Sequence, residues 1–156
     1  MRRVQILLLL TIILLISGCA GGRKAKTRKI ETVLTTARSY TGTPYKFGGL
    51  NRSGMDCSGL LYLSYRSAGI NIPRTSKEQS KYGKKIRIDE LRPGDMVFFG
   101  SEKRRRRVSH AGIVTTVRGN SSVRFIHAST SLGVVESELY TDYYQRIFVR
   151  GRRPKF

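Results

Sequence analysis

The segment Gly54–Ala68 constrains the fold of this chain most, because a capping residue precedes an apolar stripe of helical period. Asp56 is a residue type that caps helix N-termini, and apolar side chains then recur three to four positions apart. These side chains are Leu60, Leu61, Tyr65 and Ala68. Gly69 provides a C-terminal stop. The segment therefore predicts a helix that begins at Cys57 and buries one face.

Cys57 lies in the first turn of this predicted helix. The helix dipole and the unpaired backbone N–H groups of a first turn stabilise anions. That environment lowers the pKa of a thiol and favours the thiolate, which is the nucleophilic form. A small buried core cysteine is the alternative that this segment alone leaves open.

The first 18 residues have the layout of an export signal. Two arginines precede an apolar run, Ile6–Ile16, that is shorter than the about 20 residues a membrane span needs. Small residues then lead directly to Cys19, which resembles a bacterial lipobox. Residues 1–18 are therefore predicted to be a lipoprotein signal peptide, with Cys19 lipidated; an uncleaved anchor or an ordinary secretory signal is the alternative. Since Ala20 rather than Asp follows, we expect an outer-membrane location facing the periplasm.

The chain contains two cysteines, and lipidation of one would leave the other alone. If Cys19 carries lipid, Cys57 has no disulfide partner within the chain. A lone thiol in an oxidising compartment favours a functional requirement for it. The cysteine count thus supports the nucleophile interpretation of Cys57.

The formal net charge of +20 would suggest nucleic-acid binding in a cytosolic protein. The export signal argues against nucleic acid and leaves lipid headgroups, lipopolysaccharide phosphates and wall-peptide carboxylates as candidate anions. Lys103–Arg107 is a run of five cations, which predicts a solvated loop. We hypothesise that this loop binds such anionic surfaces; a solvated loop without a partner, or a generally basic lineage, are the alternatives.

The order of the expected elements predicts an α+β fold. Residues 19–29 are basic without apolar periodicity and are predicted to be a linker, whereas Ile30–Tyr40 has the pattern of an amphipathic helix. Later strands are expected at Met96–Phe99, His110–Val117, Ser122–Ala128, Val134–Val135 and Ile147–Val149. We predict a domain at residues 30–151, with N-terminal helices packed on a central antiparallel sheet of about five to six strands. A basic tail, residues 152–156, follows.

A predicted hairpin relates the two histidines. Gly119–Asn120 fits the centre of a two-residue turn, which places Gly112 opposite His127 and His110 two residues further along the same face. Such diagonal neighbours lie roughly 7 Å apart at Cα, a distance that two imidazoles can bridge. One histidine could take the Cys57 proton while the other orients it.

Alternatives to this histidine pair remain open. A register slip of one residue would put the two rings on opposite faces of the hairpin, and one histidine or neither could then be catalytic. A zinc site is disfavoured, because the spacing is not that of short ligand motifs and no clear fourth ligand is present.

Six segments in this order and spacing resemble the NlpC-type cell-wall peptidases, papain-like cysteine hydrolases of bacterial envelopes. The segments are Thr43–Gly49, Met55–Leu60, Pro73–Ser76 with Gln79, Leu91–Phe99, Ser109–Ile113 and Ile126–Ser129. The resemblance covers about residues 30 to 150, and the lipobox is similar to that of the lipoprotein branch of the family. It implies a papain-like fold without a metal or an organic cofactor. We expect a monomer.

The resemblance also implies roles for individual residues. Cys57 matches the nucleophile, His110 the general base and acid, and His127 the polar residue that holds His110. Tyr45 matches a tyrosine placed to help the oxyanion, and the backbone N–H of Cys57 would be the second donor. Positions beside the bound peptide match Asp56, Ser58, Arg74 and Ser76. For Asp56 the two interpretations, helix cap and substrate contact, are compatible.

The implied activity is hydrolysis of an amide bond in murein stem peptides through a thioester on Cys57. Two bonds fit the family: D-glutamyl to diaminopimelate within one stem, or diaminopimelate to D-alanine across a crosslink. The lipoprotein form slightly favours the crosslink. The alternatives are a non-catalytic murein-binding lipoprotein, or a thioester-forming amidase or transferase on the same fold.

Overall fold

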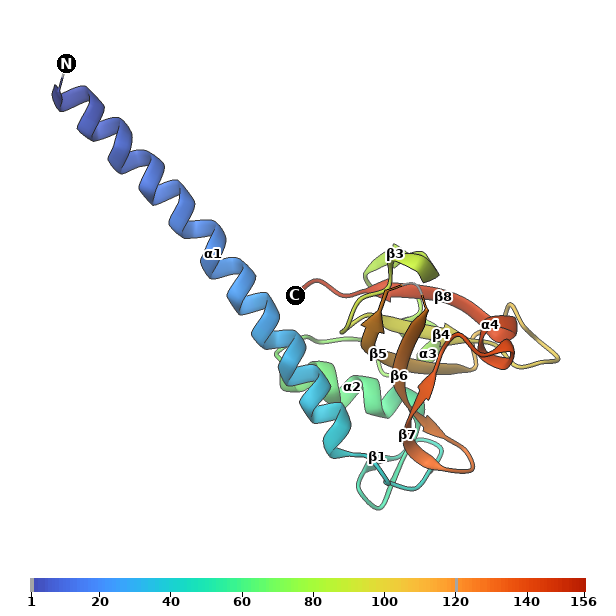
Figure 1. Cartoon of the computed structure of the whole chain (residues 1–156). Coiled ribbons are helices and arrows are strands. Elements are labelled where there is room, and N and C mark those ends of the chain that lie inside the picture. Colours follow the sequence, from blue (N-terminus) through green and yellow to red (C-terminus); the bar gives the residue numbers. More distant parts are fainter. Residues whose placement is uncertain (1, 120) are drawn as a thin grey trace.

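A computed structural model describes the backbone of residues 2–119 and 121–156, and the side chains of residues 21–119 and 121–156. The chain forms a long N-terminal helix that projects away from a mixed α/β domain (Figure 1). In chain order the elements are α1 (Arg2–Ser39), β1 (Leu50–Asn51), β2 (Gly54–Met55), α2 (Cys57–Ser67), α3 (Ser76–Gln79), β3 (Lys84–Ile86), the 3-10 turn η1 (Ile88–Glu90), β4 (Met96–Phe99), β5 (His110–Arg118), β6 (Ser122–Ser129), β7 (Gly133–Glu138), α4 (Asp142–Ile147) and β8 (Phe148–Arg153).

Two sequence predictions fall outside the described part of the chain. The side chain of Cys19, the predicted lipidation site, is one of them, and Asn120 at the predicted turn is the other. Among the described residues, none of the helices is long and apolar enough to cross a membrane.

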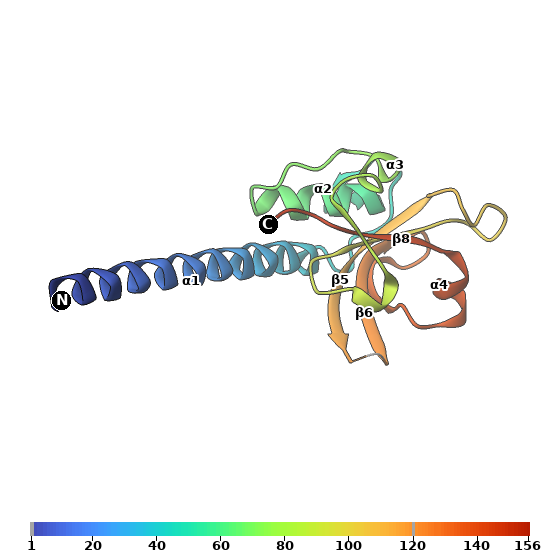
Figure 2. The same cartoon turned by 90° about the horizontal axis from the view of Figure 1, so that it is seen from above.

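The domain is built on a six-stranded antiparallel sheet with the strand order β3-β8-β4-β5-β6-β7, and β1 and β2 form a separate pair. Successive side chains of β4 enter different cores: Met96 and Phe98 join α1 and α2 on one face, whereas Val97 and Phe99 lie on the other. Ile147 of α4 belongs to this second core. Figure 2 shows α2 and α4 on different sides of the sheet. The predicted α+β fold is confirmed.

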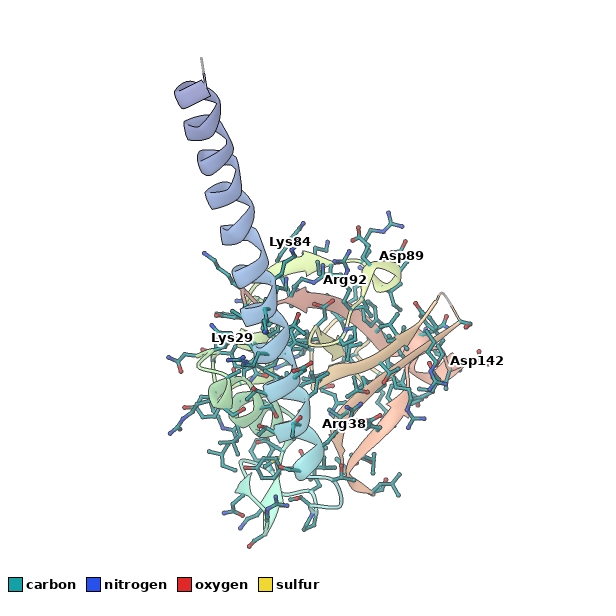
Figure 3. All side chains as sticks on the ribbon, turned by 60° about the vertical axis from the view of Figure 1, so that its left-hand side comes forward. Lys29, Arg38, Lys84, Asp89, Arg92 and Asp142 are labelled. Atoms are coloured by element: carbon teal, nitrogen blue, oxygen red, sulfur yellow. The ribbon has the colours of Figure 1, made fainter. Side chains whose placement is uncertain are left out.

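Residues 21–29, for which the sequence predicts a linker, are helical in α1. This segment lacks proline, and five of its nine residues are lysine or arginine, which are good helix formers. Residues 21–29 are nevertheless exposed, and burial begins at Val33. Near its end, Arg38 donates from Nε to Glu136 of β7 at 2.8 Å (Figure 3). Among the described side chains of α1, those buried in the domain therefore come from its last turns.

Helix α2 begins and ends where the sequence predicts. The Asp56 side chain caps it by accepting a hydrogen bond from the Gly59 N–H at 2.6 Å. The helix ends at Ser67, and Gly69 then takes a positive φ of 72°. Leu60, Leu61 and Tyr65 are fully buried against the sheet.

The hairpin of β5 and β6 has the predicted register near the histidines, although its connection is longer than predicted. Arg118 pairs with Ser122, so three residues rather than two connect the strands. The register then shifts between Val114 and Thr116, and beyond this bulge Ile113 pairs with Ile126. The bulge compensates for the longer connection, so the histidine-bearing ends of the strands keep the predicted alignment.

The predicted basic tail, residues 152–156, begins inside a strand. Arg152 and Arg153 belong to β8, which pairs with both β3 and β4. Arg153 donates from Nε and Nη2 to the two carboxylate oxygens of the buried Asp95, each at 2.7 Å. This bidentate pair holds the strand end in place, which the charge pattern of the sequence does not reveal.

Gly59 allows the loop before α2 to approach the helix closely. A Cβ atom at this position would lie 2.5 Å from the carbonyl oxygen of Gly49 and 3.2 Å from a carboxylate oxygen of Asp56. Backbone cannot move away as a flexible side chain can. The contact between loop and helix therefore requires glycine.

We expect Gly59→Ala to lower the free energy of unfolding, although alanine favours helix by about 1 kcal/mol. Overpacking against backbone costs typically about 1–3 kcal/mol, which outweighs that gain. Gly22→Ala is the matched control, because it is also helical but has nothing within 4 Å of its Cβ position. Urea unfolding of both variants measures the difference; equal stability of the two would contradict the steric argument.

Candidate active site

Cys57 is a buried free thiol, 6% exposed, in the first turn of α2. Its sulfur accepts a hydrogen bond from the backbone N–H of Ala111, the residue that follows His110 in β5. Burial nevertheless raises the pKa of the Cys57 thiol to about 11, because the loss of hydration outweighs this hydrogen bond. The sequence prediction of a lowered thiol pKa is therefore wrong for the unliganded protein, since it considered the helix dipole without burial.

The two histidines lie in contact, as the hairpin register predicts. Nε2 of His110 and Nδ1 of His127 are 2.8 Å apart, and the rings are nearly perpendicular. Burial lowers the pKa of His110 to about 4. Burial and the charge of His110 lower the pKa of His127 to about 3. Both imidazoles are therefore neutral near pH 7, beside a protonated thiol.

Two further residues contact His127 that the sequence analysis did not identify. Nε2 of His127 is 2.9 Å from Oγ of Ser137 and 3.3 Å from the hydroxyl of Tyr144. Ser137 lies on β7, where Val135 pairs with His127, so the two side chains are diagonal neighbours on one face. Extending the predicted strand by two residues would have found Ser137. Tyr144 lies on α4, which the sequence analysis did not predict.

This chain of contacts permits one arrangement of protons in which His110 is a base. Nδ1 of His110 has no hydrogen-bond partner among the described side chains. It can accept a proton if Nε2–H of His110 donates to Nδ1 of His127. Nε2–H of His127 then donates to Ser137 or Tyr144, whose oxygens can accept. In this tautomer each ring N–H has an acceptor within the network.

A cavity of about 260 Å³ lies at the histidine pair. Its lining consists of Tyr45, Gly100, Ser101, Ser109, His110, His127, Ser129, Thr130, Tyr143, Tyr144 and Ile147. Cys57 does not line this cavity. Burial raises the pKa of Tyr45, and the nearby Cys57 and Asp56 raise it further. An isolated β-bridge pairs the backbone of Tyr45 with that of Met55, which holds this tyrosine beside the start of α2. The structure therefore brings Tyr45, the thiol and the histidines to one region.

Asp56 is the centre of a second group of predicted residues. Its Oδ1 accepts hydrogen bonds from Gly59 N–H, the Ser58 hydroxyl and Arg74, and its Oδ2 accepts from Arg74 and Gly48 N–H. Burial would raise the pKa of Asp56, but the hydrogen bond from Arg74 and those from Gly59 and Ser58 lower it overall. The capping role is confirmed, and protein donors occupy both carboxylate oxygens.

The predicted contacts with a bound peptide stay predictions for this group. Asp56, Ser58 and Arg74 are joined by hydrogen bonds, whereas Ser76 begins α3 and makes no side-chain hydrogen bond to them among the described residues. None of the four lines the cavity at the histidine pair. Within the described side chains, no group of three or more His, Cys, Asp or Glu residues is arranged to hold a metal ion.

Comparison with known sequences identifies one family over most of the chain. The profile of the NlpC/P60 family matches residues 42–153. The chain is 37% identical over 155 residues to the probable endopeptidase NlpC of Escherichia coli K12, covering 94% of this chain and 97% of that protein. It is 40% identical over 126 residues to the bifunctional muramidase/DL-endopeptidase CwlT of Bacillus subtilis, covering 80% of this chain but only 36% of that protein. Murein DD-endopeptidase MepS/Murein LD-carboxypeptidase of E. coli K12 is 36% identical over 115 residues, which cover 73% and 57%.

Solved structures share the fold. An NlpC/P60 family protein from Bacillus cereus superposes with a TM-score of 0.71 at 29% identity, covering 80% of this chain and 39% of that one. A Staphylococcus aureus protein described as similar to lipoprotein, NLP/P60 family, gives a TM-score of 0.70 at 30% identity, with 83% and 42% covered. The chain spans about two fifths of each of these structures.

The raised thiol pKa predicts how Cys57 reacts with an alkylating agent. Because only thiolate reacts, we expect the iodoacetamide rate to stay low up to pH 9 and to show no plateau there, given the pKa of about 11. A peptide of the same local sequence, with a thiol pKa of about 8.5, is the control and should level off near pH 9.5. A plateau for the folded protein at or below the peptide midpoint would show that burial does not govern this thiol.

Proposed function

The chain belongs to the NlpC/P60 family, and we propose that it is a cysteine peptidase that cuts an amide bond in peptidoglycan stem peptides. The observation that supports this most is the hydrogen-bonded pair of His110 and His127 at the start of β5 and near the end of β6. The next backbone N–H of β5, that of Ala111, contacts the sulfur of Cys57. In this proposal Cys57 is the nucleophile, His110 is the base and His127 is the group that orients the base.

The proposed reaction is acyl transfer through a thioester. Sγ of Cys57 attacks the amide carbonyl carbon as its proton moves to Nδ1 of His110. The carbon–nitrogen bond then breaks, and His110 returns the proton to the leaving amine. Water, activated by His110, releases the acid and restores the thiol. Because thiol and imidazole are neutral at rest, the proton transfer accompanies attack rather than preceding it.

Two donors are available for the oxyanion that forms during attack. The backbone N–H of Cys57 is in the first helical turn, where such groups have no partner within the helix. Tyr45 is the second donor in this proposal, because it lines the cavity with the histidines and is held next to Met55. A donor of this kind typically contributes about 3 kcal/mol to the stability of the transition state.

The proposal also specifies which bond of the stem peptide is cut. One relative is named a DL-endopeptidase and another a DD-endopeptidase, which correspond to the two bonds that the sequence leaves open. We favour the crosslink between diaminopimelate and D-alanine, since the predicted lipobox is similar to that of the lipoprotein branch. In this proposal lipid on Cys19 anchors the enzyme in the outer membrane, facing the periplasm, and the enzyme acts as a monomer.

A direct test compares the full chain in nonionic detergent with its Cys57→Ala variant. Each is incubated with purified murein and with defined muropeptides of both bond types, and the products are identified by mass spectrometry. We expect the unmodified chain to cut and the variant to lose at least about 1000-fold of the rate, because the thioester cannot form. A folded wild-type chain that sediments with murein but cuts no substrate would instead indicate a binding lipoprotein. Products in which an acceptor amine replaces water would indicate a transferase.

The contacts that Ser137 and Tyr144 make with His127 predict that replacing both residues lowers activity by more than the two single replacements combined. Ser137 and Tyr144 can each accept the proton of His127 Nε2, so one replaces the other when either is removed. We expect Ser137→Ala and Tyr144→Phe each to lower kcat/KM by less than about tenfold, and the double variant by about 10- to 100-fold, more than the product of the two.

Tyr143→Phe is the control for this pair, because Tyr143 also lines the cavity but makes no hydrogen bond to His127 among the described residues. The tautomer of His127 in each variant is read from the ¹⁵N chemical shifts of its ring. Mixed tautomers should appear only in the double variant. A purely structural role would leave the tautomer unchanged in all of them.

A further inference from the structure

A cavity of about 370 Å³ away from the histidine pair is surrounded by cations. It brings together the segment of α3, the loop between β4 and β5, and β8; Figure 2 shows this loop projecting beyond the sheet. Its lining residues are Lys77, Ser80, Lys81, Arg106, Arg107, Val108 and Arg150. Five of these seven residues are cationic and none is acidic. Residues far apart in the sequence thus converge with one sign of charge.

These five cations have no partner within the described part of the protein. The carboxylates that form ion pairs there are bound by other arginines: Arg38, Arg74, Arg87, Arg124 and Arg153. Among the described residues, no hydrogen bond or ion pair joins any of these five cationic side chains to a partner, and the Ser80 hydroxyl donates to the carbonyl oxygen of Lys77 at 2.7 Å. Like charges around one hollow repel each other, so this arrangement lowers stability unless an anion from outside compensates it.

A second cavity that is also lined by cations differs, because it contains acidic residues as well. It has a volume of about 410 Å³ and is lined by Lys84, Arg92 and Arg153, but also by Asp89 and Glu90. Lys84, Asp89 and Arg92 lie on the same edge of the domain (Figure 3). Its charges are therefore of both signs and compensate one another. The cavity at Arg106 and Arg107 lacks such compensation.

We propose that the cavity lined by Lys77, Lys81, Arg106, Arg107 and Arg150 binds a phosphate-bearing anion. A carboxylate carries one charge and two acceptor oxygens, which is too little for five cations from three segments. A phosphate monoester carries a charge of about −1.5 to −2 and three strong acceptor oxygens that several side chains can share. Arginine also matches phosphate with two parallel N–H donors, and three of the five cations are arginines.

The site is independent of the proposed peptidase activity but lies close to it along the chain. Val108, part of the cavity lining, packs against the first core, and Ser109 then lines the cavity at the histidines. A phosphate bound in this cavity would therefore lie next to the residues that lead into β5 and the histidine pair. The phosphate chemistry fits both a lipid headgroup that carries a phosphate monoester and a free phosphate.

Calorimetric titration of the full chain in nonionic detergent tests the site with three probes. Inorganic pyrophosphate represents free phosphate, glycerol 3-phosphate represents a headgroup with a phosphate monoester, and citrate is an anion without phosphorus. We expect saturable binding of at least one phosphate probe, at least about tenfold tighter than citrate. Arg106→Gln with Arg107→Gln should weaken that binding at least about tenfold, and so should Lys77→Gln with Lys81→Gln. The phosphate probe that binds more tightly indicates whether the natural ligand is a lipid headgroup or a free phosphate.

Lys103→Gln with Arg105→Gln is the matched control. It removes the same charge from the same loop, but neither residue lines the cavity. We expect its affinity to stay within about twofold of the unmodified chain. Equal loss in this control, equal affinity for citrate, or no saturable binding would overturn the proposal. Thermal unfolding checks that each variant is folded, and because no murein is present, the result does not depend on whether the chain is a peptidase.

Discussion

The carboxylate of Asp56 is the interaction on which the rest of the structure depends. It accepts five hydrogen bonds, and these come from three parts of the chain: the loop at Gly48, the first turn of α2, and Arg74. The loop carries Tyr45 and the helix begins with Cys57, so one buried anion determines how these two residues lie relative to each other. Its pairing with Arg74 makes burial of the charge tolerable, because a buried carboxylate without a partner would take up a proton instead.

The environment of the thiol keeps the proposed catalytic groups uncharged at rest. Cys57 belongs to the core that α1 and α2 form with the sheet, whereas the rings of His110 and His127 pack near Phe99 and Phe125 of the opposite face. Each group is thus surrounded by apolar side chains, and burial disfavours its charged form. Near pH 7 the thiol and both imidazoles are therefore neutral in this structure.

Much of this arrangement follows from local sequence signals, and the remainder depends on packing. The cap at Asp56, the stop at Gly69 and the apolar strand Met96–Phe99 were predicted because each depends on neighbouring residues. The proximity of the histidines was predicted because strand pairing converts sequence distance into geometry. The raised pKa of Cys57 was missed, since burial is a property of the folded core. Tyr144 was missed for the same reason: the short helix that carries it has no clear apolar period and forms against the sheet.

The bulge in β5 has a consequence for how this hairpin can change in evolution. One unpaired position near Thr115 offsets one additional residue at the tip, so the pairing of Ile113 with Ile126 does not depend on the length of the connection alone. Insertions at an exposed tip are among the commonest changes in related chains. In a hairpin without a bulge, a single insertion would exchange inward and outward faces along the strand. Here the bulge separates the exposed end of the hairpin from the pairing that brings the two imidazoles together.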